Sequence, residues 1–190
     1  MDWKSLKAAV AECTKCRLCQ GRTQTVIGVG DEKAKWLFIG EGPGRNEDLR
    51  GEPFVGPAGK LLDNMLLAMG LRRGENAYIA NIVKCRPTDD SGRDRPPAPD
   101  EAAACMPYLR RQIELIQPTV IVALGKTAAL SLLGLDPDTP VSKLRGSVHR
   151  YAERPLIVTY HPAYLLRSLP DKKKAWADLC LAMSTYAGLD

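Results

Sequence analysis

The six cysteines of this 190-residue chain are its most chemically informative residues. Cys13, Cys16 and Cys19 cluster near the N-terminus, whereas Cys85 and Cys105 come much later. The N-terminal group alone is compatible with zinc, an iron-sulfur cluster or a redox pair. Four thiolates are needed to close a tetrahedral zinc site or a cubane cluster, and Cys85 and Cys105 complete such a set with Cys13 and Cys16. The sequence therefore predicts a metal centre with these four ligands.

The two remaining cysteines are interpreted differently. Cys19 is a spare thiol or a substitute ligand for the same centre. Cys180 lies between Leu179 and Leu181, a setting typical of a buried apolar cysteine. No Cys-Pro pair follows the N-terminal group, which argues against a ferredoxin-type electron carrier.

Four apolar, β-rich runs alternate with helical stretches along the chain. Strands are expected at residues 36–39, 78–83, 119–124 and 156–160, and helices at 1–12, 58–69, 99–116, 126–133 and 172–186. This alternation predicts a doubly wound, mostly parallel α/β sheet. Ligands of such sheets bind beyond the carboxyl ends of the strands. The candidate site residues therefore lie in the ranges 40–48, 81–87, 125–127 and 161–167.

Length and composition restrict the class of protein. A chain of 190 residues suits one domain, 1–190, and can bury a core without disulfides. No apolar run approaches the roughly 20 residues of a membrane span, and the N-terminal stretch lacks the pattern of a secretory leader. We therefore expect a soluble, intracellular (cytoplasmic) protein whose thiols stay reduced. The net charge of +5 permits a polyanionic partner without requiring one.

Two glycine-containing turns resemble nucleotide-binding motifs but have the wrong spacing. Gly40 and Gly42 would need a third glycine at Arg45 to complete a dinucleotide fingerprint. The tripeptide Gly125-Lys126-Thr127 resembles the end of a P-loop, but the leading glycine would fall at Val120, inside a strand. We interpret the tripeptide as a helix start with a phosphate contact at most. A small nucleotide-binding redox protein is accordingly a distant third interpretation.

A series of motifs extends in order along nearly the whole chain. They are Cys13-x-x-Cys16, residues 40–44 with Glu47-Asp48, residues 51–59, residues 81–87, Cys105 and His161-Pro162. Together they resemble the family-4 uracil-DNA glycosylases. The resemblance implies a single domain with a four-stranded, mostly parallel sheet between helices and a [4Fe-4S] cluster. It also implies an enzyme of base excision repair, which hydrolyses the N-glycosidic bond of uracil in DNA and leaves an abasic site.

The resemblance implies how uracil would be recognised after the nucleotide is flipped out of the duplex. Asn81 would accept from uracil N3–H and donate to O4, whereas cytosine presents the opposite groups. Phe54 would stack on the ring, and Glu47 would exclude the methyl group of thymine. The alternatives are an Asn satisfied by backbone, a Phe in ordinary loop packing, and a solvated or arginine-paired turn at Glu47-Asp48.

Cleavage of the glycosidic bond develops positive charge on the sugar and negative charge on uracil. By the same resemblance, His161 would donate to uracil O2, helped by the backbone amides of Glu41 and Gly42. Glu41 would position the water or stabilise the oxocarbenium-like sugar. The other histidine, His149, lies in a basic connection and is interpreted as a surface residue.

DNA contacts are expected directly after the His161-Pro162 motif. The family places a wedge loop here, so Leu165 or Leu166 would enter the duplex and Arg167 would contact phosphate. We expect a monomer that binds uracil-containing DNA. The alternative function is a non-catalytic iron-sulfur or zinc module that binds nucleic acid without releasing a base.

Overall fold

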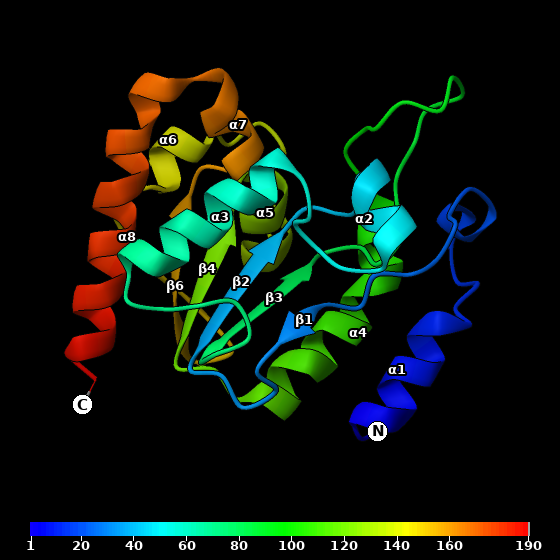
Figure 1. The fold of residues 1–190 in the computed structure, drawn as a ribbon, viewed down its shortest axis with the longest axis horizontal. Helices are drawn as coiled ribbons and strands as arrows, with labels where there is room; N and C mark the ends of the chain where they lie inside the picture. The colour runs from blue at the N-terminus through cyan, green and yellow to red at the C-terminus, as the bar shows by residue number, and fades with distance from the viewer. Residues whose placement is uncertain (190) are drawn as a thin grey trace.

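A six-stranded sheet forms the centre of the fold (Figure 1). The computed structural model describes residues 1–189. In order across the sheet, the strands are β1 (Val29–Gly30), β3 (Ala77–Asn81), β2 (Trp36–Gly40), β4 (Val120–Leu124), β6 (Arg154–Thr159) and β5 (Val148–Tyr151). The four central strands run parallel, as the sequence predicts, and β1 and β5 are antiparallel edge strands.

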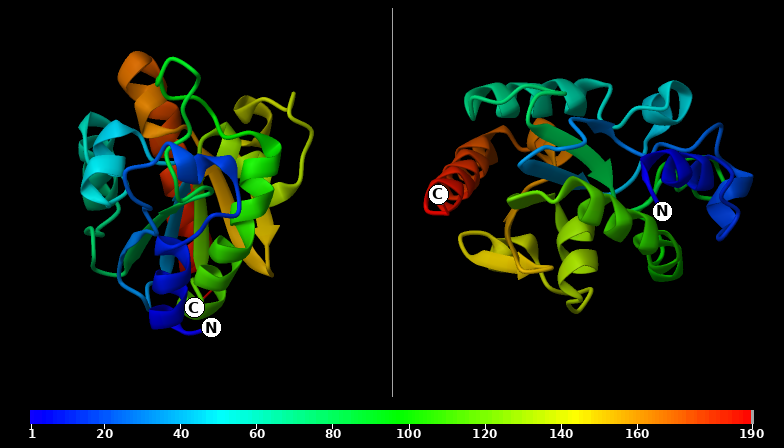
Figure 2. Two further views of the ribbon diagram at one scale, coloured as in Figure 1. Left: turned by 90° about the vertical axis from the view of Figure 1, so that its right-hand side faces the viewer. Right: turned by 90° about the horizontal axis from the view of Figure 1, so that it is seen from below.

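Helices cover both faces of the sheet, so every residue of β2, β3 and β4 is buried (Figure 2). Successive side chains of a strand point to opposite faces. Leu37 and Ile39 pack in one core cluster, and Trp36 and Phe38 pack in the other. The first face is covered by α1 (Trp3–Ala11), α4 (Pro99–Ile116), α5 (Lys126–Leu133) and α6 (Val141–Leu144), and the second by α3 (Pro57–Ala68) and α8 (Lys172–Ala187).

The predicted helices are confirmed to within a few residues, but the shortest elements were not predicted. These are the strands β1 and β5 and the helices α6, α2 (Arg45–Arg50) and α7 (Pro162–Arg167), together with the 3-10 turns η1 (Arg17–Gln20) and η2 (Leu169–Asp171). One or two turns of helix are too short to show a hydrophobic period. None of the helices within residues 1–189 is both long and apolar enough to cross a bilayer.

The connection between β3 and α4 is a loop that side chains hold in place. The carboxylate of Asp89 accepts from the backbone N–H of Arg93 at 3.0 Å. Near the other end, Arg95 donates two hydrogen bonds, of 2.7 and 2.9 Å, to the fully buried carboxylate of Glu101. Arg17 in η1 binds the same carboxylate. These donors hold the pKa of Glu101 at about 2, so the loop is fixed to α4 and η1 by a charged carboxylate.

Candidate active site and cysteine cluster

The carboxyl ends of the parallel strands converge on one cleft, at the edge of the sheet where the sequence predicts a site. Glu41 follows β2, Asn81 ends β3, Gly125 follows β4 and His161 comes shortly after β6. Glu41, Gly125, Thr127 and His161 line this cleft, which has a volume of about 470 Å³. The cleft is therefore the candidate active site.

Asn81 is a buried polar residue at the end of β3 and does not itself line this cleft. It pairs in register with Gly40 on β2, and a Cβ at residue 40 would lie 2.6 Å from Asn81 Oδ1 and 2.7 Å from the ring of Phe54. A glycine at 40 therefore lets the amide and the ring approach each other. No hydrogen-bond donor within residues 1–189 reaches Asn81 Oδ1. A buried acceptor without a partner costs about 1–3 kcal/mol, so this oxygen suits a donor that a ligand brings.

Phe54 is held in an uncommon backbone conformation next to Asn81. Its φ of 54° lies in the left-handed region, which is costly for a residue with a large side chain. Arg73 stabilises this turn by donating to the backbone carbonyls of Pro53 and Phe54 at 2.9 and 2.7 Å. The ring of Phe54 stacks on His161 with centroids 5.3 Å apart. The loop therefore presents an aromatic face to the site.

His161 is the N-cap of α7, and its partner defines its protonation. The backbone N–H of Ala163 donates to His161 Nδ1 at 3.1 Å, so in the neutral ring the proton lies on Nε2. Burial, together with the positive charge of Arg167, lowers the pKa of His161 to about 4. His161 is thus a neutral imidazole at physiological pH, with Nε2–H available as a hydrogen-bond donor.

Glu41 is a half-buried carboxylate with one protein partner within residues 1–189. The hydroxyl of Thr127, in the first turn of α5, donates to Glu41 Oε2 at 2.5 Å. Burial raises the pKa of Glu41, and the Thr127 hydroxyl opposes this rise. A carboxylate in a cleft, with one oxygen held by a hydroxyl, can orient a water molecule or stabilise a positive charge.

Gly42 and Glu47 do not line the cleft; Gly42 lies in the turn after β2, and Glu47 lies in α2. A Cβ at Gly42 would lie 2.7 Å from the side chain of Val83, so the turn after β2 is tightly packed. Glu47, in α2, accepts from the backbone N–H of Val55 at 3.3 Å and so contacts the loop that carries Phe54. The neighbouring carboxylate of Asp48 is buried and accepts from backbone N–H groups, so the arginine-paired interpretation is wrong for it.

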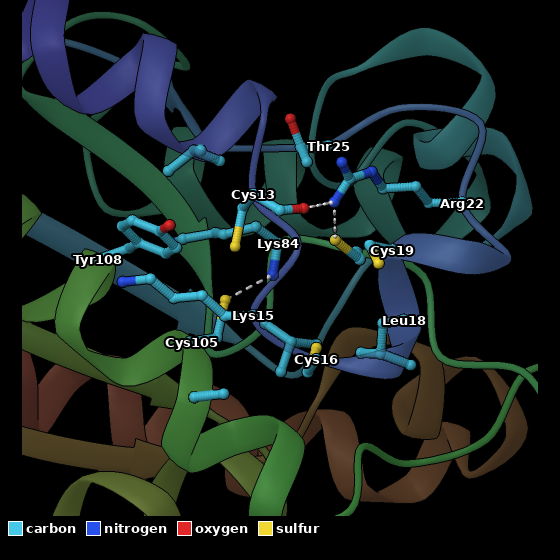
Figure 3. Close-up of a pocket in the computed structure, with 14 residues that line it drawn as sticks. Cys13, Lys15, Cys16, Leu18, Cys19, Arg22, Thr25, Lys84, Cys105 and Tyr108 are labelled. Carbon is cyan, nitrogen blue, oxygen red and sulfur yellow. Dashed lines mark hydrogen bonds between the residues drawn. The ribbon is translucent and has the colours of Figure 1, made fainter.

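The N-terminal cysteines and the two later ones meet around one enclosed cavity (Figure 3). The five cysteines that line it are Cys13, Cys16, Cys19, Cys85 and Cys105. Three come from the segment after α1, one from the segment after β3 and one from α4. The predicted ligand set is therefore brought together, and Cys19 lies with it. Cys180 was expected in the core, but it lies exposed on α8, because the buried stripe of that helix passes through Leu179 instead.

Basic and N–H groups surround the sulfur atoms of this cavity. Arg22 donates to Cys85 Sγ at 3.2 Å, and the backbone N–H of Lys84 donates to Cys105 Sγ at 3.3 Å. Burial raises the pKa of the free Cys85 thiol to about 11 and also raises that of Cys105. Thiolates at these positions therefore need a counter-charge, which a bound metal would supply. No three His, Cys, Asp or Glu residues in the described part of the chain converge closely enough to hold a single ion.

Comparisons with known proteins identify the family. A model of the Uracil DNA glycosylase superfamily matches residues 27–180. The chain belongs to this superfamily. Over 163 residues it is 48% identical to a type-4 uracil-DNA glycosylase of Archaeoglobus fulgidus, covering 83% of this chain and 79% of the relative. A type-4 enzyme of Thermotoga maritima is 46% identical, with 84% and 80% covered. One of Pyrobaculum aerophilum is 37% identical, with 100% and 96% covered.

The family-4 resemblance predicted from the motifs is thus confirmed, but this superfamily member differs from one expectation about DNA contacts. The segment after His161 is the helix α7 rather than a loop. Leu165 is 1% exposed and packs with Leu179 in a core cluster, so it is not positioned to enter a duplex. Leu166 is 41% exposed, and Arg167 lines the cleft. Leu165 is therefore wrong as a wedge, because an amphipathic helix buries every third or fourth residue.

Three residues with roles in the site were missed or underrated at the sequence level. Thr127 lies in the candidate range 125–127, but it was interpreted as part of a helix start with a phosphate contact at most. Arg73 and Arg22 lie far in sequence from the residues they support, and no pattern connects them with Phe54 or Cys85.

His149 is partly buried rather than a free surface residue, because a ring nitrogen lies 2.8 Å from the carbonyl of Leu144.

Proposed function

We propose that this chain is a uracil-DNA glycosylase, which flips uracil out of DNA and hydrolyses its N-glycosidic bond. The observation that carries the proposal is the buried Oδ1 of Asn81, which has no partner within residues 1–189 and lies close to the ring of Phe54, which in turn stacks on His161. The type-4 names of its relatives agree with this assignment. The products are free uracil and DNA with an abasic site, as the first step of base excision repair requires.

Recognition of uracil rests on the chemistry of one amide. Asn81 Oδ1 accepts from uracil N3–H and its Nδ2 donates to O4, while the ring of Phe54 provides a stacking surface. Cytosine brings an acceptor at N3 and a donor at its exocyclic amine, so it would leave buried groups unpaired. Such mismatches reject an analogue by about 10⁴-fold or more, far better than shape does. Glu47 remains the proposed residue that excludes the methyl group of thymine.

Cleavage is a hydrolysis in which the bond between the sugar and uracil N1 breaks and its electron pair leaves with uracil. His161 Nε2–H donates to uracil O2 and stabilises the developing anion, with the backbone N–H groups of Glu41 and Gly42 in support. The carboxylate of Glu41 stabilises positive charge on the sugar and orients a water molecule. Water oxygen bonds to the sugar carbon, and its proton passes to Glu41 and then to solvent. Uracil takes up a proton to complete the balance.

The cysteine cavity fits a [4Fe-4S] cluster held by Cys13, Cys16, Cys85 and Cys105. A cubane presents four separate iron atoms, so its ligands do not need to converge on one point as the ligands of a zinc ion do. The basic groups of Arg22 and Lys84 fit the negative charge of cysteine-ligated iron. When bound, the cluster supplies a cross-link between chain segments, and the hydrolysis itself needs no electrons.

DNA binding is proposed for the rim of the cleft. Leu166 is the exposed leucine of α7 and would fill the space that the flipped nucleotide leaves. Arg167 would contact a phosphate, which fixes the register of the strand. We expect the protein to act as a monomer on uracil-containing DNA.

The proposal is tested by release of uracil from a labelled oligonucleotide, followed by alkaline scission, with the absorbance of the same sample recorded. We expect scission at U but not at C or T, and a broad band near ~400 nm from a cysteine-ligated cluster. Asn81→Ala should lose uracil release. Asn64→Ala is the matched control, because Asn64 is an exposed residue of α3 and should leave activity unchanged.

Two results would contradict parts of this proposal. A coloured protein that binds DNA tightly but releases no base would be the non-catalytic module. A colourless protein with full activity would retain the glycosylase and exclude the cluster.

A further inference from the structure

We propose that the turn Gly125-Lys126-Thr127 between β4 and α5 is the element that positions both catalytic side chains, with Thr127 holding Glu41 and Gly125 seating His161. The inference rests on the proposed function, since it assigns positioning residues for that reaction. The tripeptide Gly125-Lys126-Thr127 resembles part of a P-loop, but its contacts with Glu41 and His161 indicate a different role.

Thr127 holds the carboxylate of Glu41 from a position in a helix. It lies in the first turn of α5, and its hydroxyl donates to Glu41 Oε2 at 2.5 Å. The contact spans 86 residues of sequence and joins the turn after β2 to the turn after β4. The hydrogen bond to Oε2 fixes the orientation of the carboxylate. The other oxygen, Oε1, is left to interact with water or with the sugar. A hydroxyl that donates to a carboxylate also favours its charged form.

Gly125 brings His161 against the same turn. Its φ is +95°, and its backbone N–H donates to the carbonyl of Thr159 at 2.9 Å, which extends the pairing of β4 with β6. A Cβ at residue 125 would lie 2.9 Å from the Cβ of His161. A side chain here would displace the histidine, so glycine is required both for the backbone conformation and for the approach.

The charged surroundings of Glu41 determine how the inference must be tested. Burial raises the pKa of Glu41 and the Thr127 hydroxyl lowers it. The other titratable or charged groups that line the cleft are Lys126 from α5, Asp94 and Arg95 from the β3–α4 loop, His161 at the N-cap of α7, and Tyr164 and Arg167 from α7. These groups stay unchanged when only Thr127 is replaced. Loss of the hydroxyl should therefore raise the pKa of Glu41 and move the acidic limb of the activity profile to higher pH.

The experiment measures single-turnover uracil release from a single-stranded oligonucleotide between pH 5.5 and 9 for the intact protein, Thr127→Val and Thr127→Ser. Valine has nearly the shape of threonine but no hydroxyl, whereas serine keeps the donor. For Thr127→Val we expect slower uracil release at the acidic end of this range, in keeping with a lost hydrogen bond to a charged group. The acidic limb should move to higher pH, with recovery of the rate at pH 9. Thr127→Ser should retain the profile of the intact protein.

Gly125→Ala provides the second arm. It should slow uracil release at every pH without moving the acidic limb, because it displaces His161 and leaves Thr127 in place. Melting temperatures show whether each variant is folded. A Thr127→Val protein that is folded and has an unchanged profile, or loses activity equally at all pH values, would overturn the role of Thr127. A folded Gly125→Ala protein with full activity would overturn that of Gly125. Absence of uracil release from the intact protein would instead refute the proposed function.

Discussion

The neutral state of His161 leads to a prediction about stability at acidic pH. Its pKa in the folded protein is about 4, compared with 6.5 for an ordinary histidine, because the ring is buried and lies near Arg167. Unfolding exposes the ring and restores its ordinary pKa. The unfolded chain therefore binds a proton that the folded chain does not, from pH 6.5 down to about 4. The neutral ring of His161 therefore makes its full contribution to folding stability above pH 6.5. This contribution is lost as the pH falls from 6.5 to about 4.

The magnitude follows from the same two values. Each pH unit below 6.5 costs about 1.4 kcal/mol while the folded ring stays neutral. Lowering the pH from 7.5 to 5 should therefore remove about 2 kcal/mol of folding free energy through His161 alone. His161→Gln should lack this component. Other titrating groups, Glu41 among them, are present in both proteins, so their contributions largely cancel in the difference.

Urea unfolding at pH 7.5 and pH 5 measures this difference for the intact protein and His161→Gln. His149→Gln is the matched control, because His149 is the other histidine of the chain and should leave the loss in place. A proton NMR titration gives the pKa of each ring directly. A His161 resonance that titrates near 6.5, or an equal loss of stability in His161→Gln, would refute both the buried neutral ring and its role as an Nε2–H donor.

Three further substitutions test other parts of the site. Gly40→Ala should reduce uracil release by at least about 100-fold while the protein stays folded, because the new methyl group displaces Asn81; near-normal kinetics would contradict the uracil slot. Leu166→Ala should slow uracil release from duplex DNA more than from single-stranded DNA, whereas Leu165→Ala should instead destabilise the protein by about 2–5 kcal/mol. Release rates on duplex and single-stranded substrates measure the first effect, and denaturant unfolding measures the second. The reverse pattern would restore Leu165 as the wedge. Cys85→Ala should give a colourless protein with a lower melting temperature; a stable, fully active colourless variant would show that the cluster is dispensable.

The central sheet was predictable because its four strands are buried on both faces and read as unbroken apolar runs. The same signal made the predicted strand 78–83 extend two residues too far. Ile82 and Val83 are buried and donate to the carbonyls of Gly40 and Glu41, but they lie beyond the end of the strand. Hydropathy indicates which residues are buried, but it does not indicate where the hydrogen-bonded pairing of two strands ends. The short edge strands β1 and β5 are partly exposed, so they have no comparable signal.

The site was predictable where residues follow strand ends, and less so where they act from a distance. Glu41, Asn81 and His161 lie at such ends, and the parallel topology brings them together. Arg73 supports the Phe54 turn from another loop, and nothing in its local sequence marks that contact. The orientation of α7 was also hidden, because Leu165 and Leu166 are equivalent as residue types and only helical phase decides which one is exposed.

One short segment links the cysteine cavity with the proposed uracil pocket. Asn81 ends β3, and Cys85 follows four residues later. Between them, the buried Lys84 donates through Nζ to the backbone carbonyl of Asn81 at 2.9 Å, and through its backbone N–H to Cys105 Sγ at 3.3 Å. The same residue therefore contacts the strand end proposed to read the base and one of the proposed cluster ligands. A cluster bound by Cys85 and Cys105 would fix one end of this segment, and the rigidity would reach the amide at the other end. The proposed cluster would thus have a structural reason to accompany a hydrolysis that transfers no electrons.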